Sequence, residues 1–487
     1  MLRILPTHVG IIHFIGIGGI GMSGIAEILH MMGYQIQGSD IQENANVKRL
    51  QGHGIPIFIG HSPKHLENVA VVVVSSDIRA SNIELKEARE QQLPIIHRAQ
   101  MLAELMRLKP AIAVAGSHGK TTTTSLLEAV LSKAGEDPTV VSGGIINTYG
   151  TNARLGSGEW IIVEADESDG SFIKLPATIA IVTNIDPEHM NYYPSFENLQ
   201  EAFVTFVENL PFYGLGVICY DHPHARALLP RFNDRRTITY GFSPEADLQA
   251  CGVEVKSEYT SFSLELSPRA QKILGHPQSR EKPLPARIEN LRVSLLGQHN
   301  VLNTLAVIAV ALEMGVEVAA LREGLMAFSG VKRRFTKVGT FQQATIIDDY
   351  AHHPVEIAAV LKTARQCSQG RVIAVVQPHR YSRLSLLFDD FAGCFEEADS
   401  VIIAPIYGAG EEPIEGLTHE RLAEAIKARG GCEVITIQQE SELAPLLREL
   451  LQPHDYVVCM GAGSITAWAQ NLPEALTVQA DDLRRRA

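Results

Sequence analysis

The chain has 487 residues, a length that predicts about three domains of ordinary size. Hydrophobic residues make up 45% of the chain and charged residues 20%. This balance is typical of a globular protein with an ample core and excludes a disordered or fibrous chain. The formal net charge of −13 argues against nucleic-acid binding, because neutralising phosphates requires a basic surface.

The six cysteines lie far apart and form no C-x-x-C pair. In a chain of this length, that spacing indicates buried thiols in a reducing compartment rather than a disulfide framework or a zinc site. The first residues lack the uninterrupted apolar stretch of a signal peptide, and no segment reaches the ~20 apolar residues of a membrane span. We therefore expect a cytoplasmic protein that does not bind membranes.

Short β-branched runs alternate with longer helical patterns along the chain. The expected strands are Gly10–Ile15, Val69–Ser75, Ala111–Ala115, Trp160–Glu164, Ile179–Thr183, Val372–Val376 and Ser400–Ala404. Apolar runs separated by helices indicate parallel strands covered on both faces, so the expected class is α/β with several sheets. Breaks near residues 107–110 and 328–334 predict domains 1–108, 109–328 and 329–487. A polar, proline-rich stretch from Ser267 to Arg287 is expected to be a surface loop.

A first glycine loop fits G-x-G-x-x-G between a strand and a helical pattern. Its candidate ligand-binding residues are Gly16, Gly18, Gly19, Ile20 and Gly21, and Asp40 follows 19 residues after the last glycine. Glycines let the backbone approach a diphosphate, and the amides at the helix start point at it. An acidic residue at the end of the second strand suits a ribose hydroxyl. NAD, FAD and a UDP-sugar all present these groups, and a turn without a ligand is the other alternative.

A second glycine loop follows the strand at 111–115 and precedes an expected helix, Thr123–Ala134. Its candidate nucleotide-binding residues are Gly116, Ser117, His118, Gly119, Lys120, Thr121 and Thr122. The Gly-Lys-Thr core is typical of loops in which backbone amides hold the β-phosphate, the lysine neutralises β/γ charge and the hydroxyl of Thr121 ligates Mg²⁺. Val114 stands where the general motif has glycine, so this loop is a shorter variant. A structural turn with no ligand is a poor alternative at such a junction.

Two nucleotide-binding loops in one chain are more informative than either alone. A dehydrogenase needs no ATP cradle, and a simple kinase needs no separate Rossmann-like domain. An enzyme that holds a nucleotide-sugar in the first loop and activates it with ATP at the second needs both. A nicotinamide-dependent oxidoreductase explains only the first loop, and a catalytically silent nucleotide-binding scaffold is a further alternative.

Acidic residues and a histidine follow two expected strands of the middle domain. Glu164 ends one strand, and Asp166, Glu167 and Asp169 come directly after it. Because parallel sheets place ligands at the carboxyl ends of strands, Glu164 is the favoured Mg²⁺ ligand, while the other three are equally well explained as a solvated turn. His189 follows the next strand and is a candidate second metal ligand, with a structural histidine as its alternative.

The last domain has polar groups at two further strand ends. They are Asp349, Tyr350, His352 and His353 after one strand, and His379, Arg380 and Arg383 after the next. The two arginines are suited to a carboxylate or a phosphate. Asp349 is suited to an amino group or a ribose. The basic cluster 332–334, which includes Arg334, is explained equally well as a γ-phosphate contact and as a solvated turn.

These features in this order resemble the Mur ligase family of peptidoglycan synthetases, over almost the whole chain. The stretches that take part are His13–Gly24, Gly116–Thr122, Glu164–Phe172, Thr183–Met190, Gly297–Asn303, Asp348–Pro354 and Pro378–Arg383. The resemblance is sharpest for the branch that adds L-alanine, through Glu164–Phe172 and Tyr350–Pro354. Residues 190–208 contain no lysine, so the carbamylated lysine of many relatives is not expected here.

The resemblance implies three α/β domains: an N-terminal Rossmann-like UDP-substrate domain, a central P-loop ATPase-type domain and a C-terminal Rossmann-like domain that closes over the site. It implies ATP and Mg²⁺ (or Mn²⁺) as cofactors, UDP-N-acetylmuramate and L-alanine as substrates, and a monomer or homodimer. The implied residues are Gly16 to Gly21 for the UDP diphosphate; Lys120, Thr121, Glu164 and His189 for ATP and metal; Asn300 and Asn303 near adenine; and Tyr350, His352, His379, Arg380 and Arg383 around the amino acid.

The implied reaction activates a carboxylate, which by itself is a poor electrophile. ATP phosphorylates the lactyl carboxylate to an acyl phosphate, the neutral amine of L-alanine attacks, and phosphate leaves. His352 and Asp349 are the candidates that assist loss of the amine proton. The nearest alternative within the family is a ligase that attaches a recycled tripeptide to the same sugar.

Overall fold

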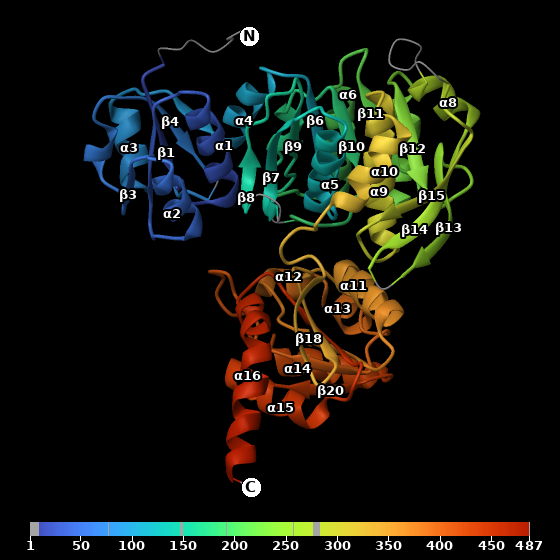
Figure 1. Cartoon of the computed structure of the whole chain (residues 1–487). Helices are drawn as coiled ribbons and strands as arrows, with labels where there is room; N and C mark the ends of the chain where they lie inside the picture. Colours follow the sequence, from blue (N-terminus) through green and yellow to red (C-terminus); the bar gives the residue numbers. More distant parts are fainter. Residues whose placement is uncertain are drawn as a thin grey trace. The chain divides into compact units, whose positions relative to one another are not determined.

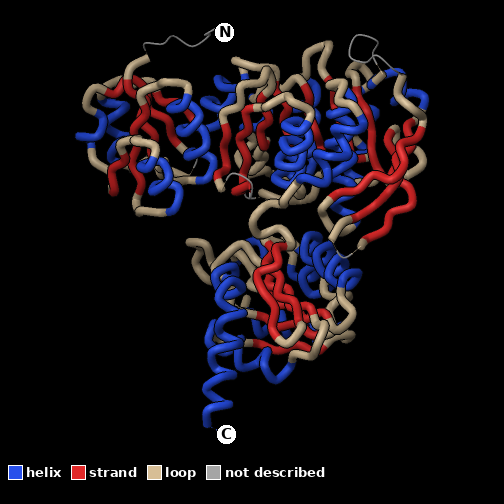
Figure 2. The backbone as a smooth tube through the Cα atoms, in the orientation of Figure 1, coloured by secondary structure: helices blue, strands red, loops and turns tan. Residues whose placement is uncertain are grey.

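A computed structural model describes residues 9–75, 77–146, 150–190, 192–256, 258–275 and 283–486, with side chains up to residue 477. The chain divides into two compact units. The first comprises Met1–Val253, Ser261–Ser294 and Asn300–Gly330, and the second Glu254–Thr260, Leu295–His299 and Val331–Ala487. Helices and strands alternate through both units, so the expected α/β class is confirmed (Figures 1 and 2).

The N-terminal sheet has five strands in the order β3-β2-β1-β4-β5, counted over the described residues. Its strands are β1 (Ile11–Ile15), β2 (Ile36–Asp40), β3 (Ile57–Ile59), β4 (Val69–Val74) and β5 (Ile95–His97), and its helices are α1 (Ile20–Met31), α2 (Ala45–Gly52), η1 (Pro63–Leu66), α3 (Ile83–Glu90) and α4 (Arg98–Met106). Neighbouring strands pair in parallel. The side chains of Asn44 and Asn82 accept from backbone amides and so fix the starts of α2 and α3.

The central sheet has ten strands within the described ranges, in the order β15-β14-β13-β12-β11-β10-β6-β9-β7-β8. Its strands are β6 (Ala111–Ala115), β7 (Thr139–Ile146), β8 (Thr151–Arg154), β9 (Ile161–Glu164), β10 (Ile179–Val182), β11 (Leu215–Cys219), β12 (Thr237–Gly241), β13 (Leu248–Val255), β14 (Thr260–Leu266) and β15 (Arg287–Val293). The helices between and after them are α5 (Lys120–Lys133), η2 (Ser171–Lys174), α6 (Phe196–Glu208), α7 (Pro223–Ala227), η3 (Leu229–Phe232), α8 (Pro268–Leu274), α9 (Gln298–Glu313) and α10 (Val318–Ala327). Strands β6, β10 and β11 are buried along their whole length, which explains their continuous apolar runs.

The C-terminal sheet has six strands in the part of the chain that the structure describes, in the order β16-β17-β21-β18-β19-β20. Its strands are β16 (Thr336–Phe341), β17 (Ala344–Asp349), β18 (Val372–Val376), β19 (Ser400–Ile403), β20 (Glu433–Thr436) and β21 (Tyr456–Met460). Its helices are α11 (Pro354–Cys367), α12 (Tyr381–Leu386), α13 (Phe388–Gly393), α14 (His419–Arg429), η4 (Glu440–Glu442), α15 (Leu443–Leu450) and α16 (Ile465–Arg486). The β16–β17 hairpin is antiparallel and the remaining pairs are parallel, with an apolar core on each face.

The first two sheets belong to one compact unit because they share an apolar core. Met22 and Leu29 of α1 and Leu102 of α4 pack in the same cluster as Val141 of β7 and Ala153 of β8. Figure 1 shows α1 and α4 beside this edge of the central sheet. Each of the Met, Leu and Val side chains contributes about 1.5–3 kcal/mol when it is fully buried. The N-terminal helices therefore serve both sheets.

The strands expected from the sequence are all present, but two expectations need correction. Helix α5 begins at Lys120, so the second glycine loop passes directly into the helix. The stretch after Ser267, expected to be a loop, begins with helix α8. There Ser267 accepts from the amide of Ala270 and Pro268 occupies the first turn, a start signal that the polar composition concealed.

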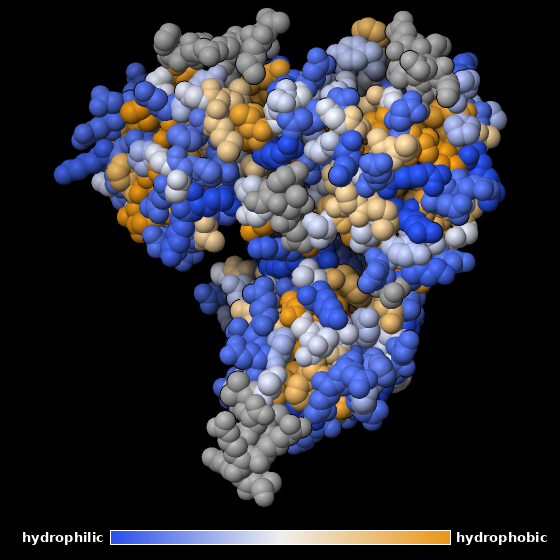
Figure 3. Space-filling view, viewed as in Figure 1, coloured by the Kyte–Doolittle hydropathy of each residue, from blue (hydrophilic) through white to orange (hydrophobic). Residues whose placement is uncertain are grey.

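Within the described ranges, no helix combines the length and the apolarity that crossing a membrane requires. On the face in Figure 3, hydrophilic side chains cover most of the surface and hydrophobic ones form small patches between them.

Candidate active site

The second glycine loop lies between the end of β6 and the start of α5. At two of its glycines there is no room for a side chain. Gly116 has φ 134°, and a Cβ there would lie 2.1 Å from the hydroxyl of Thr183. Gly119 has φ 83°, and its Cβ would lie 2.5 Å from the amide oxygen of Asn303. Side chains at these positions are excluded by backbone conformation and by contact. The loop is therefore pressed between the segment after β10 and helix α9.

The segment after β10 holds the loop through polar contacts. The amide of His118 donates to the side chain of Asn184 over 2.7 Å, and the hydroxyl of Thr183 donates to the carbonyl of His118 over 2.6 Å. The amide of Asp186 donates to the hydroxyl of Ser117 over 2.8 Å. These bonds fix the path of the loop before any ligand binds, so little ordering entropy remains to be lost on binding.

His118 and His222 both contact the carboxylate of Asp186, each over 3.3 Å. Burial alone would raise the pKa of Asp186, but hydrogen bonds from the two imidazoles reverse this and lower it well below the ordinary range. Asp186 is therefore a permanent anion that orients the side chain of His118, one of the predicted nucleotide-binding residues. The sequence analysis missed it because its partners lie far away in the chain.

The ammonium of Lys120 is bound to a buried carboxylate. It lies 3.0 and 2.9 Å from the two carboxylate oxygens of Glu167 and also donates to the carbonyls of Gly116 and Ser117. Burial alone would lower the pKa of Lys120, but the charge of Glu167 outweighs burial and raises the pKa. Lys120 is therefore charged and lies at the second glycine loop, where its ammonium is suited to bind a phosphate.

Thr121 and Glu164 form a second polar contact at the same strand ends. The hydroxyl of Thr121 donates to one carboxylate oxygen of Glu164 over 3.0 Å, and the amide of Gly143 donates to the other over 2.7 Å. A Cβ on Gly143 would lie 2.5 Å from this carboxylate, so a larger residue there would displace the side chain of Glu164. Burial raises the pKa of Glu164. A buried, oxygen-rich site of this kind suits a hard divalent cation, which would offset the cost of the buried charge.

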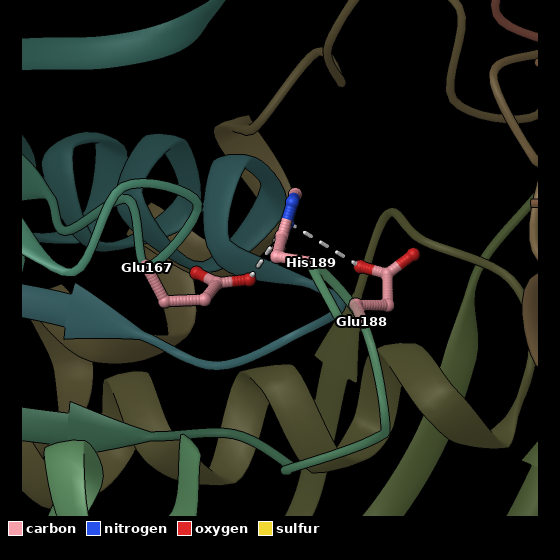
Figure 4. A group of neighbouring side chains, drawn as sticks. All are labelled: Glu167, Glu188 and His189. Carbon is pink, nitrogen blue, oxygen red and sulfur yellow. Dashed lines mark ion pairs between the residues drawn. The ribbon is translucent and has the colours of Figure 1, made fainter. Parts of the chain in front are cut away.

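A group with the donor set of a metal site lies beside Lys120. Ligand atoms of Glu167, Glu188 and His189 all lie within 4.8 Å of one another (Figure 4). The imidazole Nε2 of His189 lies 3.5 Å from Glu167 and 3.9 Å from Glu188. Burial alone would lower the pKa of His189, but its hydrogen bond to Glu167 raises it. His189 has φ 56°, a conformation uncommon for histidine, and it places the ring between the two carboxylates.

The predicted metal ligands therefore fall into two neighbouring groups. Thr121 contacts Glu164, whereas His189 contacts Glu167 and Glu188. Lys120 links the groups, because the charges of Glu167 and Glu164 both act on it. The sequence analysis explained Glu167 equally well as a metal ligand and as part of a solvated turn, and it did not single out Glu188.

Helix α9 brings the predicted adenine-side residues to the loop. Asn303 is in contact with Gly119 and donates to the side-chain oxygen of Asn300 over 3.2 Å. Both asparagines are buried. Their role toward adenine stays a prediction, and their position next to the glycine loop is compatible with it. Thr122, predicted for the same ligand, is buried in the first turn of α5.

The first glycine loop is held by backbone contacts and by side chains that bind Gly18. The amides of Gly16 and Ile17 donate to the carbonyl of Ser39 over 2.8 and 3.0 Å. The amide of Gly18 donates to the carboxylate of Asp40 over 2.8 Å. A Cβ on Gly18 would lie 2.8 Å from this carboxylate, while Gly19 has ordinary space and φ −60°. Asp40, predicted to meet a ribose, thus also braces the loop itself.

A buried cluster of one glutamate and three histidines contacts Ser39, the residue that binds this loop. The sequence analysis missed this cluster. The carboxylate of Glu84 accepts from Ser39 over 2.5 Å and lies 3.4, 3.1 and 2.6 Å from His13, His61 and His65. Burial alone would raise the pKa of Glu84, but the bonds from His13 and Ser39 lower it to about 2. The carbonyl of Ser39 accepts from the amide of Gly16. The cluster that binds the side chain of Ser39 therefore also supports the turn at Gly16.

In the second compact unit, several of the predicted amino-acid-binding residues gather in one cluster. The ring of His352 lies 5.0 Å from that of Tyr350 and 5.9 Å from that of His379, centre to centre. The guanidinium of Arg383 donates to Nδ1 of His379 over 3.2 Å, and that of Arg334 lies 5.3 Å from the ring centre of Tyr350. This places four predicted residues from both strand ends within one group, together with Arg334 of the basic cluster.

The imidazoles of this cluster are neutral. Burial, together with the charge of Arg383, lowers the pKa of His352 to about 3 and that of His379 to about 4. The Nδ1 atom of His352 lies 2.9 Å from the carbonyl of Tyr350 and donates to it, so Nε2 keeps its lone pair. Burial raises the pKa of Asp349 to about 6, but its two oxygens accept from the amides of Phe335 and Ala351.

Arg380 begins helix α12 at the rim of this cluster. It has φ 69°, its amide donates to the carbonyl of Tyr407 over 2.8 Å, and its guanidinium lies 3.7 Å from Glu411. The ring of Tyr407 in turn stacks on His379 at 5.5 Å. A conformation that costs free energy for arginine is held here by the surrounding bonds. The guanidinium of Arg380 is half exposed.

The fold and these two glycine loops define an α/β nucleotide-binding protein of the P-loop type, with a second, Rossmann-like loop in the same compact unit. Sequence comparison narrows this class. The family models described as "Mur ligase family, catalytic domain", "Mur ligase middle domain" and "Mur ligase, glutamate ligase domain" match residues 11–110, 114–311 and 333–463. The chain belongs to the Mur ligase family.

Individual relatives cover nearly the whole chain. The UDP-N-acetylmuramate–L-alanine ligase of Parvibaculum lavamentivorans is 54% identical over 98% of this chain and 94% of its own length. The crystal structure of UDP-N-acetylmuramate–alanine ligase from Thermotoga maritima matches with a TM-score of 0.79 and 27% identity, covering 97% of this chain and 100% of that one. A murein peptide ligase from Psychrobacter arcticus, with a TM-score of 0.67 and 24% identity over 96% of this chain and 98% of its own, shares the fold.

Proposed function

We propose that this enzyme is an ATP-dependent ligase that joins L-alanine to the lactyl carboxylate of UDP-N-acetylmuramate, a step of peptidoglycan synthesis. The observation that carries the proposal is the arrangement of the first compact unit. There, a lysine-bearing phosphate loop with buried carboxylates shares one apolar core with a glycine loop suited to a diphosphate. The 54% identity to a relative with this named activity supports the choice of substrates.

The proposed reaction follows from the phosphate and carboxylate groups that these residues are suited to bind. A lactyl carboxylate oxygen attacks the γ-phosphorus of ATP, the bond to the β-phosphate oxygen breaks, and ADP leaves with an acyl phosphate remaining. The amine nitrogen of L-alanine then attacks the acyl carbon and expels phosphate, which takes the former carboxylate oxygen with it. Lys120 and the amides at the start of α5 offset the charge on the transferred group. Water must be kept out, because it would hydrolyse the acyl phosphate.

Mg²⁺, with Mn²⁺ as a substitute, is the proposed metal. Carboxylate and hydroxyl oxygens of Thr121 and Glu164 are hard ligands at the phosphate loop, and Glu167, Glu188 and His189 form the adjoining candidate group. The ion would neutralise charge on the phosphates when bound. The protein's own part is to hold these oxygens at the ends of β9 and β10.

The residues of the second unit are proposed to serve the amino acid. Arg380 and Arg383 are suited to bind the carboxylate of the amino acid. Tyr350 and His379 are proposed to surround the amino acid. His352 and Asp349 are the two candidates for assisting loss of the amine proton. Nε2 of His352 keeps its lone pair, but the pKa of this imidazole is about 3. Asp349, whose pKa burial raises to about 6, is the stronger base, although each of its oxygens accepts from a backbone amide. We propose that the enzyme acts in the cytoplasm, as a monomer or a homodimer.

Two other functions make different predictions. A ligase for a recycled tripeptide uses the same sugar and the same ATP loop, so only the incoming amine distinguishes it. A nicotinamide-dependent oxidoreductase leaves Lys120 and its carboxylate without a role. No specific observation favours either one.

The test is release of phosphate from MgATP with UDP-N-acetylmuramate and a panel of amines. L-alanine is expected to give the strongest turnover, with the ligated product detected by mass spectrometry. Glycine, L-serine and the tripeptide L-alanyl-γ-D-glutamyl-diaminopimelate serve as competitors. Turnover with the tripeptide and none with L-alanine would contradict the proposal, and so would the absence of phosphate release with every amine.

A further inference from the structure

One of the polar side chains that connect the N-terminal and central sheets, Asn152, is bound at both ends of its amide. Asn152 of β8 is completely buried. Its amide nitrogen donates to the carbonyl of Ile20, in the first turn of α1, and its amide oxygen accepts from the guanidinium of Arg49 in α2 over 2.8 Å. A Cβ on Gly24 would lie 2.9 Å from Asn152, so helix and strand are in direct contact here.

The contact with Ile20 reaches the first glycine loop itself. Ile20 is the first residue of α1, directly after the glycine turn, where amides suited to a diphosphate are presented. Arg49 extends the same network, because its guanidinium also lies 3.3 Å from the buried carboxylate of Glu27. Thr151, next to Asn152, donates to the same carboxylate over 3.2 Å. The start of α1 is thereby fixed to strand β8.

Strand β8 is connected in turn to the second glycine loop. It pairs antiparallel with β7, where Val141 faces Ala153, and β7 pairs in parallel with β9. Two residues further along β7, the amide of Gly143 donates to Glu164, which accepts from Thr121 on its other oxygen. A continuous line of backbone pairing and hydrogen bonds therefore joins the diphosphate turn to the phosphate loop through Asn152.

We propose that Asn152 is a positioning residue, which sets the distance between the nucleotide-sugar turn and the ATP turn without touching either ligand. This inference rests on the proposed function, because only a reaction between the two ligands needs that distance. Reacting atoms must come to within about 3–3.5 Å of each other, and a misplacement of about 1 Å costs about 100-fold in rate. Each ligand alone binds to its own turn and does not depend on the line between them.

The decisive variant is Asn152→Asp, which keeps the shape and an acceptor for Arg49 but places an anionic oxygen against the carbonyl of Ile20. We expect kcat for ligation to fall about 30- to 100-fold. The dissociation constants for UDP-N-acetylmuramate alone and for ADP alone, measured by calorimetry, should each change less than about threefold. If this variant does not fold, Asn152→Ala, which has no repulsive oxygen, replaces it, and the same changes in kcat and in the two dissociation constants are expected.

A matched control lies on the same strand. Arg154 of β8 contacts Glu128 and Asp137, away from α1, so Arg154→Met removes buried polar contacts without breaking the line. We expect it to lower the melting temperature and leave kcat near the wild-type value. An unchanged kcat in Asn152→Asp overturns the inference, and so does a loss of both separate affinities in parallel with kcat. Absence of turnover in the wild-type protein would instead refute the proposed function.

Discussion

The two glycine loops use the same local device, a strand that turns through glycines into a helix, and differ in what surrounds it. The second loop carries its own cation, with Lys120 held on the buried carboxylate of Glu167. The first loop carries no cation between Gly16 and Gly21, and Asp40 binds the amide of Gly18. One loop is therefore built to handle charge that moves during a reaction, and the other to hold a diphosphate that stays unchanged.

The supports of the two loops differ as well. The second loop is in close contact with Thr183 and Asn303, where there is no room for a Cβ at Gly116 or Gly119. The first loop is supported by Ser39 and the Glu84 cluster; Gly18 is crowded by Val47 and Asp40, whereas Gly19 retains ordinary space. Rigid support for the loop that takes part in chemistry agrees with the need for preorganised electrostatics in the transition state.

The largest expected effect tests the charge difference directly. Lys120→Ala should lower kcat by about 1,000-fold or more, because it removes the cation that stabilises the transferring phosphoryl group. Binding of UDP-N-acetylmuramate alone, measured by calorimetry, should stay within about threefold of wild type. Turnover retained in Lys120→Ala would show that the second loop is not the catalytic phosphate site.

The difference in packing is tested by a pair of alanine substitutions. Gly116→Ala combines φ 134° with a Cβ 2.1 Å from Thr183, so we expect a loss of about 3–5 kcal/mol in the free energy of unfolding. Gly19→Ala, at φ −60° and 3.4 Å from its nearest neighbour, should change it by less than about 1 kcal/mol. Denaturant unfolding measures both, and equal losses would contradict the described geometry.

The buried ion pair gives the next largest effect. Glu167→Gln leaves Lys120 buried without its anion and should destabilise the free protein by about 3 kcal/mol. Phosphates that bind Lys120 supply the missing negative charge, so MgATP should raise the melting temperature more in the variant than in the wild type. A variant that is as stable as the wild type without nucleotide would show that the pair does not form.

The pH dependence of stability examines the support of the first loop. The pKa of Glu84 is about 2 in the folded protein and about 4.5 when unperturbed, so its contribution is complete above pH about 5. The contribution is lost as the pH falls toward about 2. This difference in pKa corresponds to about 3 kcal/mol of stability. Glu84→Gln should lower the unfolding free energy at neutral pH and flatten its slope between pH 5 and 2, as measured by urea unfolding. An unchanged slope would contradict the described cluster.

Local patterns predicted the parts of the molecule that depend on short stretches of chain. Glycine spacing after an apolar run located both loops, and the position of Glu164 and His189 after strands indicated that both lie at one edge of the central sheet. The start of α5 was placed three residues late because Lys120 reads as part of the loop. Helix α8 was missed because its start signal lies in a stretch of polar composition.

Contacts between distant residues were not predictable in the same way. The choice of Glu167 rather than its neighbours as partner of Lys120 depends on which side chains face the loop after Glu164. Asn152 contacts Ile20 from 132 positions away, and His13 contacts Glu84 from 71. Such pairs depend on strand order, and in the central sheet β6 pairs with β9 and β10 rather than with β7. No spacing rule in the sequence specifies that order.

The measurement that tests the central claim most directly follows an oxygen atom. UDP-N-acetylmuramate labelled with oxygen-18 in its lactyl carboxylate is converted with MgATP and L-alanine, and the released phosphate is analysed by mass spectrometry. An acyl phosphate transfers one labelled oxygen to phosphate in every turnover, so the account predicts phosphate with a single label. Unlabelled phosphate, or label found in AMP, would contradict it.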